Sequence, residues 1–254
     1  MRRRDLILGT LAGLGMPWIV HGTAQARTAA IAPARWQTAV QHFPYRLFET
    51  SGAQALAGWE RLKREGRSRP VVIGGHEDVA LLSERFEAVT TGGMETHLRT
   101  QSGLSDRDSG NKRDWPEVGT WPVDVHESPG LSVVMDIHTG KVREKVFLAL
   151  VPTEDASAIP AYLRSRDGVA EPHLDDRIAA LRSWQARYGA ELVGASNDTL
   201  NIRVKSRPQT RAEALALARE QYAFCPDIVD ECLGDLSSLA AVLMESDWWY
   251  FWWD

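Results

Sequence analysis

The end of the chain constrains its fold more than any other feature, because six consecutive residues there are aromatic. They run from Trp248 to Trp253 and are followed by Asp254. Left in water, they would form an apolar patch of a kind that soluble monomers avoid. Side chains of a strand alternate between its faces, so a strand here would place Trp248, Tyr250 and Trp252 opposite Trp249, Phe251 and Trp253. We expect an interior strand that is covered on both faces.

The same rings allow a second interpretation, in which one row lines a cleft. Exposed indole faces could then stack on a sugar or another flat ligand. The candidate binding residues on this interpretation are Trp249, Phe251, Trp253 and Tyr222.

The remaining pattern predicts an α+β fold, with a largely antiparallel or mixed sheet packed against helices and ending in the aromatic strand. Apolar periodicity and capping residues predict helices over 51–64, 78–86, 175–188 and 210–224 and from 235 onward, with caps at Asp175, Thr210 and Asp235. Alternating or β-rich runs predict a strand over 70–75 and hairpins over 131–151 and 191–205. Residues 27–45 show no sustained period and are expected to be an extended lead-in.

The first 26 residues have the three parts of an export signal. Arg2, Arg3 and Arg4 precede an uncharged run over 6–20, and an Ala24-x-Ala26 site follows. The apolar run is shorter than the ~20 residues that a spanning helix needs. The pair Arg3-Arg4 favours the twin-arginine route, with the general secretory route as the alternative. We therefore expect a periplasmic or secreted protein with no membrane span once the signal is removed.

The chain divides into four parts by composition. After the signal peptide (1–26) come an N-terminal α/β segment (27–97), a polar loop or linker rich in Ser, Gly and Pro (98–130), and a C-terminal α+β domain (131–254). The formal net charge of −5, from 29 Lys and Arg against 34 Asp and Glu, gives no basic excess for nucleic acid.

The stretch from Cys225 to Cys232 is the main candidate for chemistry. Its carboxylates Asp227, Asp230 and Glu231 could bind a hard cation or act as an acid–base pair. Acidic residues between two helices also commonly cap the second helix, which is the simpler interpretation. Because Pro226 favours a turn and export brings oxidising conditions, the two cysteines could pair as a disulfide, or Cys225 could be buried and Cys232 free.

A second polar stretch, His76-Glu77-Asp78, follows two glycines at the end of a predicted strand. Sites in α/β folds commonly occupy such positions. No metalloprotease spacing, nucleotide fingerprint or nucleophile motif accompanies it, so the sequence identifies no cofactor.

Several segments resemble the bacterial family called domain of unknown function 4253. They are Leu148–Thr153, Trp184 with Tyr188–Val193, Ala216–Tyr222 with Cys225–Val229, and Asp247–Asp254. The resemblance covers about Lys145 to Asp254 and implies a fold without an established activity. Where members carry Gly-Gly-Trp-Asn-x-Cys-Pro, this chain has Ser165–Pro172 instead, so a site built on that stretch would be lost here.

Two functional hypotheses follow. The first is a non-enzymatic domain, immunity-like in the cell envelope, that binds a protein or small-molecule ligand. The second is a hydrolase or metal-assisted enzyme that uses carboxylates near Asp227 and Asp230.

Overall fold

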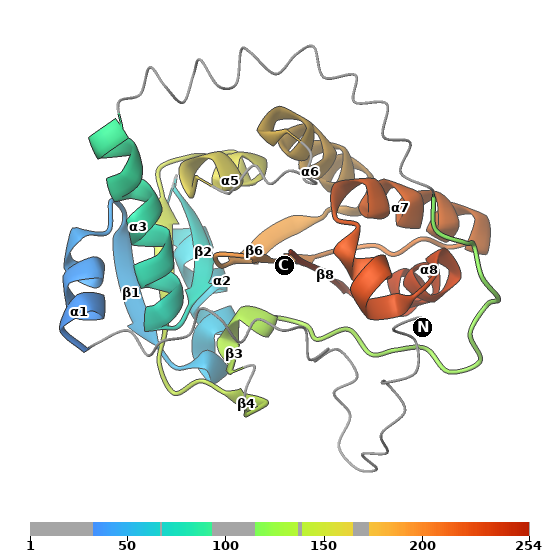
Figure 1. The fold of residues 1–254 in the computed structure, drawn as a ribbon, viewed down its shortest axis with the longest axis horizontal. Coiled ribbons are helices and arrows are strands. Elements are labelled where there is room, and N and C mark those ends of the chain that lie inside the picture. The colour runs from blue at the N-terminus through green and yellow to red at the C-terminus, as the bar shows by residue number, and fades with distance from the viewer. Residues whose placement is uncertain (1–32, 67, 93–114, 137–138, 165–172, 254) are drawn as a thin grey trace, which may run out of the picture.

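The fold is built around one six-stranded sheet, seen in a computed structural model that describes residues 33–66, 68–92, 115–136, 139–164 and 173–253 (Figure 1). The strand order is β1-β5-β2-β6-β7-β8. Its strands are β1 (Arg46–Thr50), β2 (Arg69–Gly74), β5 (Val146–Val151), β6 (Glu191–Ala195), β7 (Thr199–Arg203) and β8 (Trp248–Trp252). Every neighbouring pair is antiparallel except β2 and β6, which are parallel. The expected mixed, largely antiparallel α+β fold is confirmed.

Helices cover both faces of this sheet. The longer ones are α1 (Pro33–His42), α2 (Ala55–Glu65), α3 (His76–Gly92), α6 (Leu174–Tyr188), α7 (Arg211–Phe224) and α8 (Leu236–Glu245). Two short ones are α5 (Ile159–Tyr162) and the π-helical turn η6 (Ile228–Leu233). No helix in the described part of the chain is long and apolar enough to cross a bilayer.

Alternation along the strands separates two cores. The larger core packs one sheet face against α3 and α5 to α8, with buried rings such as Trp184 and Phe251. The smaller core packs the opposite face against α2, through Trp59 and Leu62, and against Val133 and Val134. Strands on both sides of the 98–130 segment contribute to the one sheet.

The aromatic C-terminus forms strand β8, as the sequence predicts. Trp249 and Phe251 are buried in the larger core, and the alternate rings of Trp248, Tyr250 and Trp252 are half-buried on the other face. Phe251 stacks on Trp184 with ring centroids 5.6 Å apart and planes 4° from parallel. β8 is nonetheless the edge strand of the sheet, so helices cover one face fully and the second face only in part.

The capping residues predicted at the helix ends are confirmed in three cases and differ in one. Thr210 accepts a hydrogen bond from the Glu213 amide, and Asp235 accepts one from the Ser238 amide, so both caps are confirmed. Helix α6 begins earlier than predicted, with His173 at the N-cap and Asp175 in its first turn. Gly189 ends that helix at φ 60°, as expected for a left-handed C-cap.

Two segments differ from the expectations. The supposed extended lead-in contains helix α1, whose residues pack against α3. The supposed long hairpin over 131–151 is reduced to a pair of two-residue strands, β3 (Met135–Asp136) and β4 (Lys141–Val142). β5 joins the main sheet between β1 and β2 instead, because its apolar residues are buried on both faces there.

Residues 115–130 form an irregular segment, here called the strap, that runs past α7 and α8 toward β8 (Figure 1). The carbonyls of Glu117 and Val118 accept hydrogen bonds from the first amides of α8, at 3.2 and 2.8 Å. Farther along, the Ser128 hydroxyl donates to the Trp248 carbonyl at 3.0 Å. One end of the strap therefore accepts hydrogen bonds from free amides at the N-terminus of α8. The other end reaches the outer edge of the sheet.

Candidate functional site

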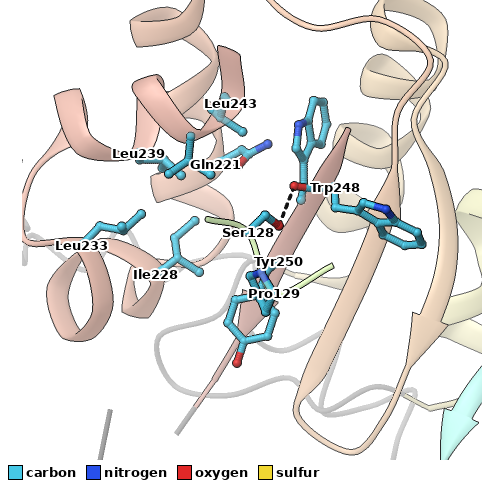
Figure 2. Close-up of a pocket in the computed structure, with 11 residues that line it drawn as sticks. Ser128, Pro129, Gln221, Ile228, Leu233, Leu239, Leu243, Trp248 and Tyr250 are labelled. Carbon is cyan, nitrogen blue, oxygen red and sulfur yellow. Dashed lines mark hydrogen bonds between the residues drawn. The ribbon is translucent and has the colours of Figure 1, made fainter. Parts of the chain in front are cut away.

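A hollow lies between the outer edge of β8 and the helices beside it, and we call it the β8-edge hollow (Figure 2). Its volume is about 290 Å³, including the part open to solvent. The helices contribute Gln221, Ile228, Leu233, Leu239, Val242 and Leu243, and the other side is formed by Trp248, Trp249 and Tyr250 with Ser128 and Pro129 of the strap. Its enclosed part has room for on the order of one water molecule.

Two buried hydrogen-bond donors belong to the walls of this hollow. The side chains of Gln221 and Trp249 are each about 1% exposed. Among the described residues, neither Nε2 of Gln221 nor Nε1 of Trp249 has an acceptor. A buried donor without a partner costs about 1–3 kcal/mol. In Figure 2 the Gln221 side chain extends from α7 toward β8, so an acceptor in the hollow would relieve this cost.

In the described part of the chain, side chains rather than another strand bind the outer edge of β8. The Trp248 carbonyl accepts from the hydroxyls of Ser128 and Ser246, each at 3.0 Å. The Trp252 carbonyl accepts from the Cys225 thiol at 3.0 Å. Such blocking of an edge strand protects a sheet from pairing with other chains, and it places Ser128 at the mouth of the hollow.

The structure does not present the predicted stacking rings to a ligand. Trp249, Phe251 and Tyr222 are 1%, 0% and 3% exposed, and Trp253 packs partly buried against the same core. Their ring faces contact other side chains, because the helices pack over this face of β8. Trp249 is therefore one of the residues that line the hollow, but its ring face is not available to a stacked ligand.

The acidic candidates do not converge on one site. Asp230 and Glu231 are exposed on η6, and Asp230 accepts a hydrogen bond from the Tyr222 hydroxyl at 3.3 Å. Asp227 precedes the same turn and is half-buried. Within the described residues, no group of three or more His, Cys, Asp or Glu side chains could hold a metal ion.

The two cysteines are separate thiols in the structure, so the disulfide considered from the sequence is not present. Cys225 is buried and Cys232 is half-buried. Burial raises the pKa of Cys232 to about 11 and that of Cys225 further, in both cases with a contribution from nearby Asp227. Both thiols are therefore protonated at neutral pH, which is the unreactive form.

A second polar cluster lies where β2 ends and α3 begins. Burial raises the pKa of Asp78 to about 7, against the opposing effects of Arg143 and of the Gly75 amide, which donates to Asp78 at 2.8 Å. Arg143 also pairs with Glu77 at 3.0 Å, and Glu77 lies 3.1 Å from His76. The His76-Glu77-Asp78 stretch thus fastens the segment after β4 to the start of α3.

Gln221 and Ser128 are site residues that the sequence analysis missed. Gln221 continues the apolar face of α7 at helical spacing after Ala214, Leu217 and Ala218, which are all buried. A polar residue on such a face is a signal of a buried hydrogen-bonding group. Ser128 carries no comparable signal, because its role depends on where the strap meets β8.

Comparison with known proteins finds a family model that is similar to the same region. Residues 147–254 match the family described as Domain of unknown function (DUF4253), which confirms the resemblance for the C-terminal part. No curated protein and no solved structure matches the chain. Gln221 and Trp249 lie inside the matched part, whereas Ser128 lies outside it. The export residues Arg3, Arg4, Ala24 and Ala26 and the stretch 165–172 fall outside the described residues.

Proposed function

We propose that the protein is a non-enzymatic binding domain of the cell envelope and that the β8-edge hollow is its binding site. The observation that carries this proposal is the presence of two unpaired, buried N–H groups on residues that line one hollow. Groups that cost stability without a partner are expected where a ligand supplies that partner. An immunity-like role, in which binding alone blocks a partner, is compatible with such a site.

The surroundings of the hollow support recognition by contact. Apolar side chains form most of its wall, and a few placed polar groups fix orientation, as in typical ligand sites. The strap beside it exposes large apolar side chains, with Trp115 60% and Val123 97% exposed. A ligand larger than the enclosed part would displace Ser128 and Pro129, which are held at the mouth by the hydroxyl of Ser128.

We expect Gln221→Leu to abolish stabilisation by the natural ligand. The low-molecular-mass fraction of an envelope extract from the native host should raise the melting temperature of the wild-type protein. A ligand at 100 times its Kd stabilises by about 2.7 kcal/mol, or about 5–10 °C at this chain length. The variant should show less than a fifth of that shift in differential scanning fluorimetry. Without ligand it should melt no lower than the parent, since leucine removes the unpaired amide.

The matched control is Gln185→Leu, which replaces an exposed glutamine of α6. It should respond to the extract as the wild type does. Equal shifts in the wild type and Gln221→Leu, or no shift in the wild type, would refute the assigned site.

We propose also that residues 1–26 export the protein by the twin-arginine route. Replacing Arg3 and Arg4 together by lysine should retain the uncleaved protein in the cytoplasm, because the twin-arginine pathway reads this pair. Cell fractionation with intact-mass measurement gives the answer, and the wild-type envelope protein should begin at Arg27. Unchanged export of the double variant would point to the general secretory route, and a full-length wild-type species in the envelope would exclude cleavage.

A further inference from the structure

We propose that the β8-edge hollow takes a neutral carbonyl group carried on an apolar moiety, such as a carboxamide, in preference to an anion or a cation. This inference rests on the proposed function and adds the chemical class of the ligand. It follows from three properties of the wall, which are its unpaired hydrogen-bonding groups, its charge and its apolar surface.

The unpaired groups of the wall are donors. Nε2 of Gln221 and Nε1 of Trp249 each carry hydrogen and lack an acceptor. The hydroxyl of Ser128 already donates its hydrogen bond to the Trp248 carbonyl. An ammonium group has only donors, so it would leave both N–H groups unpaired. A carbonyl oxygen has two lone pairs and could accept from both.

The described part of the wall carries no compensating charge. Among the described residues that line the hollow, none is Asp, Glu, Lys, Arg or His. Moving an isolated carboxylate out of water costs several kcal/mol unless a countercharge or many hydrogen bonds offset this cost. Two neutral N–H donors do not replace a cation, whereas they are sufficient for a neutral carbonyl. The lack of a positive charge among the described lining residues therefore disfavours anions. The two unpaired N–H donors disfavour cations.

The rest of the wall selects for an apolar body. Ile228, Leu233, Leu239 and Leu243 form the helix side of the hollow, and Figure 2 shows them facing the strand that carries Trp248 and Tyr250. Burying apolar surface against them contributes about 25 cal/mol per Å². A compact alicyclic or branched aliphatic group joined to the carbonyl meets both requirements.

The test is an NMR titration of the ¹⁵N-labelled protein as it is purified from the native host. The indole N–H signal of Trp249 is assigned with Trp249→Phe, and the side-chain amide of Gln221 with Gln221→Leu. The probes are cyclohexanecarboxamide, cyclohexanecarboxylate and cyclohexylammonium, which share one ring and differ in charge and hydrogen bonding. We expect the carboxamide to shift both signals in a saturable way, and the two ions to bind at least tenfold more weakly. In Gln221→Leu, carboxamide affinity should fall by at least tenfold (about 1.4 kcal/mol), whereas Gln185→Leu should bind as the wild type does.

The outcomes separate this inference from the proposed function. If either ion shifts these signals as strongly as the carboxamide, the ligand class is wrong but the hollow remains a binding site. If no probe moves either signal, the hollow holds only water and both proposals fail. A further probe, N-acetyl-leucine methylamide, identifies the source of the carbonyl. Tighter binding than that of cyclohexanecarboxamide would assign it to a peptide, and weaker binding would assign it to a non-peptide amide.

Discussion

Replacing Phe251 by alanine is expected to lower the free energy of unfolding by about 3–5 kcal/mol, the usual cost of removing a large ring from a packed core. The Phe251 side chain is fully buried. It stacks on Trp184 and meets Phe224 edge-on with centroids 4.9 Å apart. Such a loss is a large part of a total stability of about 5–15 kcal/mol. At this chain length it corresponds to a fall of about 6–20 °C in melting temperature, measured by calorimetry.

Trp252→Ala is the matched control, because it removes a larger ring from the next position of the same strand. Trp252 lies on the opposite, half-buried face of β8, so we expect a smaller loss than at Phe251. Deletion of residues 248–254 should prevent soluble folding altogether. A truncated protein that melts like the parent, or equal losses at Phe251 and Trp252, would contradict the packing described here.

Replacing Asp78 by asparagine should stabilise the protein at neutral and alkaline pH but not in acid. The native carboxyl has a pKa raised from 3.8 to about 7, chiefly by burial. Its neutral form favours folding fully below about pH 4, and this contribution is lost as the pH rises through 7. The difference between the two pKa values corresponds to up to about 4 kcal/mol. Asparagine keeps an oxygen that can accept from the Gly75 amide and does not ionise.

Urea unfolding of both proteins at pH 4.5, 6 and 8.5 checks this expectation. The difference in stability between Asp78→Asn and the wild type should be near zero at the lowest pH and largest at the highest. Glu77→Gln is the control, because Glu77 shares Arg143 with Asp78 but is more exposed. The Glu77→Gln variant should show the same pH dependence of the free energy of unfolding as the wild type. A stability difference at Asp78 that does not change with pH would show that folding leaves the pKa of Asp78 unshifted, and a difference that grows in acid would show that Arg143 outweighs burial.

Local signals in the sequence predict most of the C-terminal part of the fold. The capping residues Thr210 and Asp235, the C-cap Gly189 and the alternation in β8 each depend on neighbours within a few residues, and each is confirmed. Helix α1 over 33–42 was missed, and the structure packs it against α3, a contact between segments that lie far apart in the sequence.

The site depends on contacts that sequence spacing does not encode. Ser128 meets Trp248 across 120 positions of the chain, and Gln221 shares a hollow with Trp249 because α7 packs beside β8. The carboxylates Asp230 and Glu231 are the residue types that chemistry would favour, yet both are exposed on η6, and Asp230 is hydrogen-bonded to the Tyr222 hydroxyl. A buried polar residue on an apolar helix face was the more informative signal.

The most direct measurement of the central claim is a crystal structure of the protein purified without denaturation from its native host. We expect electron density for a molecule larger than water in the β8-edge hollow, with an oxygen within about 3.2 Å of both Gln221 Nε2 and Trp249 Nε1. A hollow that holds a single water molecule, or one in which the two N–H groups find acceptors within the chain, would contradict it.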